Sequence, residues 1–143
     1  MNMLNEYLEN DVELYSHTTQ DITVSAAPLF VDEASVPEEN KFFWAYYIKI
    51  ENNSSKNIQL VDKSFVIADS LGNTTIAKDL GQPDNQPIVI SGDSYEYTGL
   101  TPLGTPSGII VGKIGLIDEN GLLFDIDIPA FSLDSPYENI VLN

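Results

Sequence analysis

Apolar residues alternate with other residues along most of this chain, and this period of two constrains the fold more than any other feature. The clearest run covers residues 42–50, whose even positions are all apolar and would share one face of a strand. Shorter runs with the same spacing recur on both sides of it. Their apolar members are Ile22, Val24, Ala26, Ile58, Leu60, Phe65, Ile67, Tyr95, Tyr97, Ile110, Ile114, Leu116, Leu122, Phe124, Ile126 and Ile128.

Short polar segments separate these runs at the places where a chain would reverse. Asn120-Gly121 lies between two alternating runs and is a strong hairpin signal. Segments 51–55, 69–73 and 91–93 carry similar turn-forming residues. We therefore predict an all-β fold, a sandwich of seven to nine short antiparallel strands with no helix longer than about two turns.

The length and the distribution of charge indicate one domain with an acidic extension. The chain has 143 residues, 43% of them hydrophobic, which suits a single domain with its own core. Residues 1–40 hold nine acidic residues and no basic one. We predict a flexible acidic N-terminal arm over residues 1–18 and one sandwich domain over residues 19–143.

The overall charge argues against two classes of partner. The chain has a formal net charge of −16, and its six basic residues are all lysines. Because phosphate groups are bound through arginine forks and basic patches, we expect no nucleic-acid partner and no membrane partner. The chain has no cysteine, and its start lacks the basic and apolar regions of a signal peptide. We expect a cytoplasmic protein.

Residues 101–108 form a tandem repeat of one turn-like quartet, Thr-Pro-Leu-Gly followed by Thr-Pro-Ser-Gly. Proline at the second position and glycine at the fourth favour a type I turn, so the repeat predicts a rigid elbow. In an interaction module this elbow would expose small side chains to a partner. The candidate partner-binding residues are Thr101, Leu103, Thr105 and Ser107. A stiff link that only carries the chain between sheets is the alternative interpretation.

The run over residues 42–50 leaves two aromatic residues on its outward face. If the even residues point inward, Phe43 and Tyr47 point outward. An exposed aromatic patch often marks an interface, so both are candidate partner-binding residues. Cover by the acidic arm or by a neighbouring loop is the alternative.

Several segments together resemble the ApaG family. They are the run 42–52, the pair Gln86-Pro87, the turn 91–97, the repeat 102–108, the hairpin 118–121 and the segment 128–133, in this order. The resemblance covers roughly residues 19–143 and implies an immunoglobulin-like or fibronectin type III-like sandwich. Bacterial members of this family are small stand-alone proteins associated with cobalt and magnesium tolerance, and eukaryotic relatives occur as domains of F-box and polymerase-interacting proteins.

One function proposed for the family is binding of pyrophosphate or nucleotide through a loop of pattern G-x-G-x-x-G. In this chain the three glycine positions fall at Asp79, Gly81 and Asp84, so only one glycine is present. A carboxylate at the other two positions would add bulk and repel phosphate oxygens. We therefore interpret this segment as an ordinary sheet connection.

Metal binding and catalysis find little support in the sequence. Asp125 and Asp127 lie two apart on one strand face, but a magnesium or calcium site needs further oxygen ligands, and a solvated strand face explains the pair. His17 is the only histidine, and it lies in the predicted arm, so no nucleophile has a fixed histidine base. We expect no metal site, no cofactor and no enzymatic activity.

These observations favour a binding module that acts on a protein partner whose identity the sequence does not give. A homo-oligomer stays open. The alternatives are a protein that binds a divalent cation or a phosphate ligand, and a hydrolase that acts on a nucleotide diphosphate.

Overall fold

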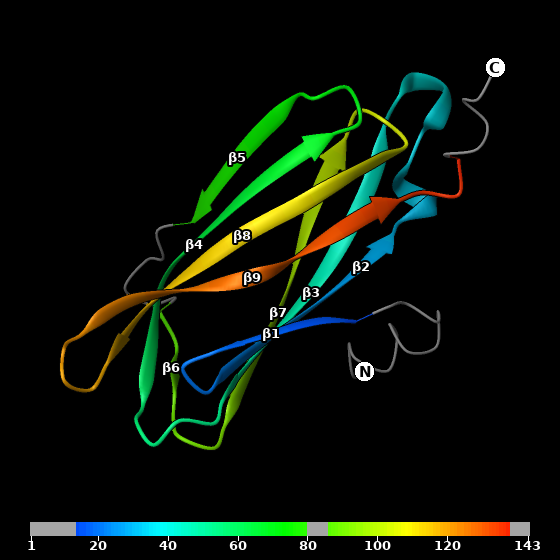
Figure 1. Cartoon of the computed structure of the whole chain (residues 1–143). Helices are drawn as coiled ribbons and strands as arrows, with labels where there is room; N and C mark the ends of the chain where they lie inside the picture. The colour runs from blue at the N-terminus through cyan, green and yellow to red at the C-terminus, as the bar shows by residue number, and fades with distance from the viewer. Residues whose placement is uncertain (1–13, 80–85, 138–143) are drawn as a thin grey trace.

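The chain forms two antiparallel β-sheets. The computed structural model describes residues 14–79 and 86–137. Four strands form one sheet in the order β1-β2-β3-β7, and the five-stranded sheet has the order β5-β4-β8-β9, with β6 paired to β4 (Figure 1). The bounds are β1 Tyr15–Thr19, β2 Ile22–Phe30, β3 Phe42–Asn52, β4 Ile58–Asp69, β5 Thr74–Asp79, β6 Ile88–Val89, β7 Ser94–Leu103, β8 Ser107–Asp118 and β9 Leu123–Asp134.

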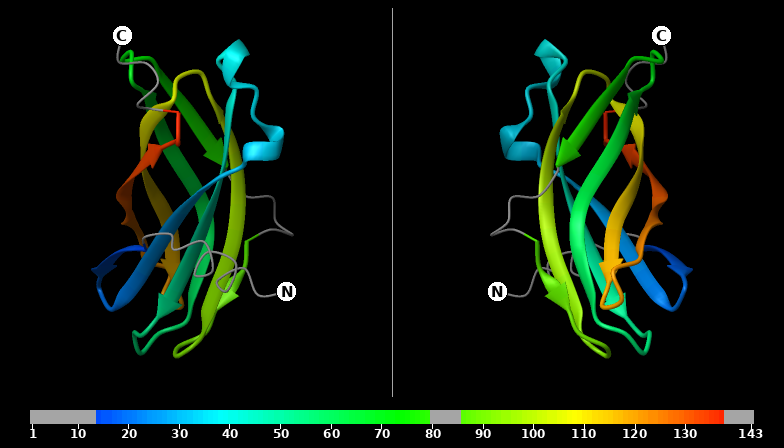
Figure 2. Two further views of the ribbon diagram at one scale, coloured as in Figure 1. Left: turned by 90° about the vertical axis from the view of Figure 1, so that its right-hand side faces the viewer. Right: turned by 90° about the vertical axis from the view of Figure 1, so that its left-hand side faces the viewer.

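The two sheets pack face to face as two layers (Figure 2). This arrangement confirms the predicted all-β sandwich of immunoglobulin or fibronectin type. Within the described ranges, the helical segments are two 3₁₀ turns of three residues, Asp32–Ala34 and Pro37–Glu39. No helix in these ranges is long and apolar enough to span a lipid bilayer.

The apolar sets that alternate in the sequence form the layer between the sheets. The even residues of β3 all point inward, and Ile48 and Ile50 are completely buried. The sets of β8 and β9 meet them from the other sheet, with Ile114 and Leu116 equally buried. Burying such a side chain stabilises the fold by about 1.5–3 kcal/mol, so this layer supplies most of the favourable free energy.

Two β-bulges explain why the inward set changes from even to odd positions along two strands. In β4 the ladder to β8 shifts between Leu60 and Asp62, and the inward residues change from Leu60 to Phe65. In β9 the shift lies after Ile128, and Phe131 becomes the next inward residue. Because side chains alternate strictly along a regular strand, one extra residue is needed to keep apolar side chains inside.

The domain begins earlier than the predicted boundary at residue 19. Strand β1 pairs with β2 from Tyr15 onward, and the Tyr15 ring lies 6.3 Å from the Phe131 ring. The hairpin was not predicted because its two-residue turn uses Gln20 and Asp21, both with positive φ (52° and 64°), where Asn-Gly is usual. The predicted arm over residues 1–18 is thus wrong for residues 15–18, and residues 1–13 lie outside the described residues.

The predicted double turn at residues 101–108 is also wrong. Thr101 and Leu103 belong to β7 and pair with Trp44 and Phe42 of β3. Residues 104–106 alone carry the chain from the four-stranded sheet to β8 of the five-stranded sheet, which agrees with the alternative interpretation of a link. Pro102 is tolerated inside β7 because β7 is an edge strand, where a missing N–H need not break the ladder.

Two hairpins of the five-stranded sheet are built in the same way, and one of them is the predicted turn at Asn120-Gly121. In the β8–β9 hairpin, the Asp118 carboxylate accepts hydrogen bonds from the N–H groups of Asn120 (2.8 Å) and Leu122 (3.0 Å). In the β4–β5 hairpin, Asp69 accepts the corresponding bonds from Leu71 and Asn73, both at 2.9 Å. The glycine at the fourth position has a positive φ in both turns.

We predict that Asp118→Asn destabilises the protein more at neutral pH than in acid. The hydrogen bond from Leu122, helped by Asn120 and by Lys56 at 3.8 Å, lowers the pKa of Asp118 below its ordinary value. A carboxylate with a lowered folded-state pKa stabilises the fold above its unfolded pKa of about 4 and loses this effect as the pH falls through the folded pKa. The difference in melting temperature between wild type and variant should therefore shrink on going from pH 7 to about pH 2.5.

The matched control is Glu119→Gln, which changes an exposed carboxylate in the same turn. It should leave the melting temperature unchanged at both pH values. An Asp118→Asn difference that is equal at both pH values would show that the carboxylate charge does not hold this turn.

Candidate functional site

The predicted partner-binding residues of the elbow are mostly buried. Thr101, Leu103 and Thr105 are each only 6% exposed, and Ser107 is half-buried. Leu103 belongs to the core, and the Thr105 hydroxyl donates to the carbonyl of Ser107 (2.7 Å) and accepts from the N–H of Ser70 (3.1 Å). The expectation that these three side chains are open to a partner is wrong, because the link closes one end of the core. Contact through Ser107 stays a prediction.

The two outward aromatic residues of β3 have different surroundings. Tyr47 is completely buried and clusters with Ala27 on the outer face of the four-stranded sheet, so the expected exposed aromatic patch is wrong for Tyr47. Burial raises the pKa of the Tyr47 hydroxyl well above its ordinary value, and the carboxylates of Glu96 and Glu51 raise it further. Tyr47 is therefore a neutral packing residue.

Phe43 is half-buried and lies against the link between the sheets. It lines a shallow groove of about 540 Å³ together with Val36, Pro102 and Leu103. The structure thus brings the predicted residues Phe43 and Leu103 together, but Leu103 contributes only the small part of its surface that is not in the core. Tyr47 is not part of this groove.

The predicted solvated carboxylates lie on β9, and the segment that corresponds to the family loop begins at the end of β5. Asp125 and Asp127 are exposed on β9, opposite Gly115 and Lys113 of β8. Within the described ranges, no group of three or more histidine, cysteine or acidic side chains could hold a metal ion. Asp79 is the last residue of β5, and the positions of Gly81 and Asp84 lie outside the described residues.

Sequence reasoning missed an exposed apolar surface on the outer face of the five-stranded sheet. Val66 is 37% exposed, and its neighbours across the ladders are Ile76 of β5 (72% exposed) and Val111 of β8 (41% exposed). Ile109, two residues before Val111, continues the surface on the same face. We call these four residues the aliphatic strip. The pattern did not reveal it because strand alternation alone does not show which strands become neighbours.

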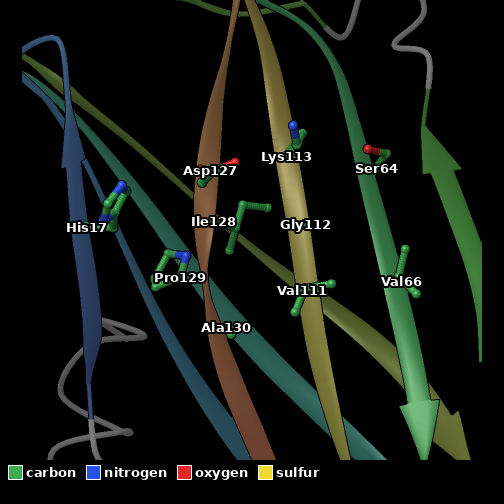
Figure 3. A pocket seen from close by; sticks show the side chains of 10 residues that line it. All are labelled: His17, Ser64, Val66, Val111, Gly112, Lys113, Asp127, Ile128, Pro129 and Ala130. Atoms are coloured by element: carbon green, nitrogen blue, oxygen red, sulfur yellow. The ribbon is translucent and has the colours of Figure 1, made fainter. Parts of the chain in front are cut away.

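An open groove of about 460 Å³ borders the aliphatic strip, and we call it the outer groove (Figure 3). Its floor is apolar and one end is polar. Strands β1, β4, β8 and β9 all contribute to it, and the lining residues are His17, Ser64, Val66, Val111, Gly112, Lys113, Asp127, Ile128, Pro129 and Ala130.

The β9 bulge gives the outer groove its shape. Gly112 pairs with Ile128, and Ile110 pairs with Phe131, so Pro129 and Ala130 together oppose Val111. Proline fits here because a bulge leaves one N–H of the strand without a ladder partner. Gly112 keeps strands β4 and β8 close, since a Cβ atom there would lie 2.7 Å from the carbonyl oxygen of Ser64.

The polar end of the outer groove is a row of side chains on neighbouring strands. Ser64, Lys113 and Asp127 are paired in register across β4, β8 and β9, and His17 lies on β1 beyond β9 (Figure 3). In the described part of the structure, none of these four side chains makes a hydrogen bond or an ion pair.

The four side chains of this row are available to contact a bound molecule. Within the described residues, the Ser64 hydroxyl has no base within hydrogen-bond reach, which is the contact that a serine nucleophile uses. Lys113 differs from Lys41, Lys49 and Lys56, which all pair with carboxylates. The row therefore offers a cation, an anion and a hydroxyl to a bound molecule.

Comparison with known proteins connects the chain to one family. The family model described as ApaG domain matches residues 32–118. The chain is 48% identical over 130 residues to Protein ApaG of Paramagnetospirillum magneticum, covering 91% of this chain and 100% of that protein. It is 40% identical to Protein ApaG of Rhodospirillum centenum, covering 87% and 95%. A crystal structure of an ApaA protein from Bordetella pertussis superposes with a TM-score of 0.77 at 34% identity, covering 81% and 94%.

We predict that Gly112→Ala destabilises the fold while Gly104→Ala does not. The added methyl group at position 112 would push against the backbone of Ser64 and the Phe65 ring (3.0 Å), whereas nothing lies within 4 Å of a Cβ at position 104. Overpacking of this kind costs about 1–3 kcal/mol. Urea denaturation of both variants measures the difference. Equal stability of the two variants would show that β4 and β8 can separate at no cost.

Proposed function

This chain belongs to the ApaG family, and from that premise we propose that it is a protein-binding module whose contact surface is the outer face of the five-stranded sheet. The observation that carries the proposal is the exposure of the aliphatic strip beside the outer groove. Val66 and Val111 are neighbours on adjacent strands, and both remain more than a third exposed. Contiguous apolar surface of this kind is a common mark of an interaction site.

The side chains of the strip favour association at a small entropic cost. Isoleucine and valine are β-branched, so few rotamers are lost when a partner immobilises them. Each square ångström of apolar surface removed from water contributes about 25 cal/mol. The strip also lies on paired strands and not on a loop, so the surface exists before the partner arrives.

The charge of the chain indicates the chemistry of the partner. With a net charge of −16 and a pI of about 4.1, the protein attracts basic surfaces over a long range. The polar row at the end of the outer groove adds an oriented cation and anion at short range. We propose a partner protein that presents aliphatic side chains surrounded by basic residues.

The outer face of the five-stranded sheet supports the two alternative functions, cation binding and nucleotide hydrolysis, less well than protein binding. Direct coordination of a divalent cation by Asp125 and Asp127 would need additional ligands, and their neighbours in register are a glycine and a lysine. A role in cobalt or magnesium tolerance, which the family resemblance implies, would then act through a bound partner. Hydrolysis of a nucleotide would need a catalytic set that the polar row does not form.

We predict that Val111→Glu abolishes partner binding without unfolding the protein. The variant places a charge in the middle of the aliphatic strip, and because Val111 is 41% exposed the melting temperature should change by only a few degrees. Affinity capture from an extract of the source organism, quantified by mass spectrometry, should show at least about a tenfold loss of the specific partner.

The matched control is Leu100→Glu. Leu100 is 73% exposed on the outer face of the other sheet, so the same change there should leave partner recovery intact. Recovery that is unchanged in Val111→Glu, or lost equally in both variants, would contradict the proposed surface.

A further inference from the structure

Among the described residues, strand β5 forms an edge of the five-stranded sheet that no further strand covers. It pairs with β4 on one side and is the last strand in the sheet order (Figure 1). The described side chains of its first half, Thr74, Thr75 and Ile76, are all exposed. These residues are β-branched, and an edge with this composition can pair with another strand.

The β4–β5 hairpin shows which backbone groups of β5 are available. The N–H of Asp69 donates to the carbonyl of Asn73 (2.9 Å), so these two residues form a hydrogen-bonded pair. Bonded and non-bonded pairs alternate in an antiparallel ladder, which makes the Ile67–Thr75 pair bonded and the Val66–Ile76 pair non-bonded. Thr74, Ile76 and Lys78 therefore direct their N–H and C=O groups away from β4.

We propose that two copies of this chain associate through antiparallel pairing of their β5 strands about a two-fold axis at Ile76. Only residues whose backbone groups point outward can bond across such an edge. Centring the pairing on Ile76 matches all of them, because Thr74 then lies opposite Lys78 of the second copy. Each matched residue donates one hydrogen bond and accepts another.

The proposed register also shields one flank of Ile76, the most exposed residue of the aliphatic strip. Ile76 is 72% exposed, and its neighbour on the outer face of the sheet is Val66 of β4. Pairing places Ile76 opposite Ile76 of the second copy on the same face, which joins the two strips into one apolar surface. Val111 and the outer groove stay open, so this association does not depend on the proposed protein partner.

Other sheet edges carry features that oppose pairing. Strand β7 contains Pro102, which lacks an N–H, and the exposed carboxylate of Glu96. Strand β9 is bent by its bulge at Pro129 and lies beside β1, where the rings of Tyr15 and Phe131 are neighbours. Within the described residues, β5 carries no proline and no bulge, which is why we place the contact there. A second copy is the occupant because the outward backbone groups of β5 match those of an identical antiparallel strand centred on Ile76.

Charge sets the conditions under which the dimer forms. Each copy has a net charge of −16, so long-range repulsion opposes association at low ionic strength. Added salt screens this repulsion over a distance of about 10 Å at 0.1 M. The dimer should therefore tighten as salt is added, which is opposite to the behaviour of an interface held by ion pairs.

Sedimentation velocity of the full chain tests the proposal, at protein concentrations from about 1 μM to about 1 mM and in both low and high salt. Ile76 of one copy lies opposite Ile76 of the other in the proposed dimer. Ile76→Lys alone and Ile76→Glu alone should therefore each weaken the dimer at least about tenfold, because each places two like charges together. An equimolar mixture of the two variants should form a heterodimer. The control Ile109→Lys, on the same face but on β8, should leave the dimer unchanged.

A second variant separates loss of pairing from loss of folding. Ile76→Pro removes an N–H that points away from β4, so it should keep the β4–β5 ladder and the circular dichroism spectrum while abolishing the dimer. A wild-type protein that stays monomeric at about 1 mM in high salt would overturn the proposal. So would dimerisation of Ile76→Pro, failure of the two charged variants to recombine, or pairing of β5 with a strand from another protein only.

Discussion

Burial of Ile48, Ile114 and Leu116 between the two sheets sets the geometry that the rest of the chain must follow. The sheets approach closely only if every strand keeps one continuous apolar side. A strand whose inward residues change from even to odd positions must therefore contain an extra residue. The bulges of β4 and β9 satisfy this requirement. The outer groove is a secondary effect of it, because the β9 bulge that returns Phe131 to the core also raises Pro129 and Ala130 on the outer face.

Local patterns in the sequence were sufficient for most of the strands and most of the turns, but they missed β1 and β5. The run at residues 42–52 and the hairpin at Gly121 required only the period of two and a glycine with positive φ. Prediction of turns from residue type was wrong where tertiary structure decides the backbone conformation. The first three residues of the Thr-Pro-Leu-Gly quartet lie in an edge strand, and the turn at Gln20-Asp21 uses residues that rarely adopt positive φ.

The candidate surface could not be found in the same way, because its residues come together only through the strand order. Ser64, Lys113 and Asp127 are far apart in the sequence and become neighbours when β8 inserts between β4 and β9. The expected exposure of Leu103 and Tyr47 failed for a related reason. Leu103 lies in a strand on its core face and not in a turn, whereas Tyr47 lies on the outer face as expected but is buried there beside Ala27. Both outcomes depend on segments that are distant in the chain.

The order of the strands has a consequence for the way the protein folds. The chain crosses between the sheets after β3, after β6 and after β7, so neither sheet is complete until a late strand returns to an early one. Strand β7 closes the first sheet against β3, and β8 then enters the second sheet beside β4. Such distant pairings give a high contact order, for which folding takes milliseconds to seconds. The two layers should therefore form and melt as a single cooperative unit, and neither half of the chain should be stable on its own.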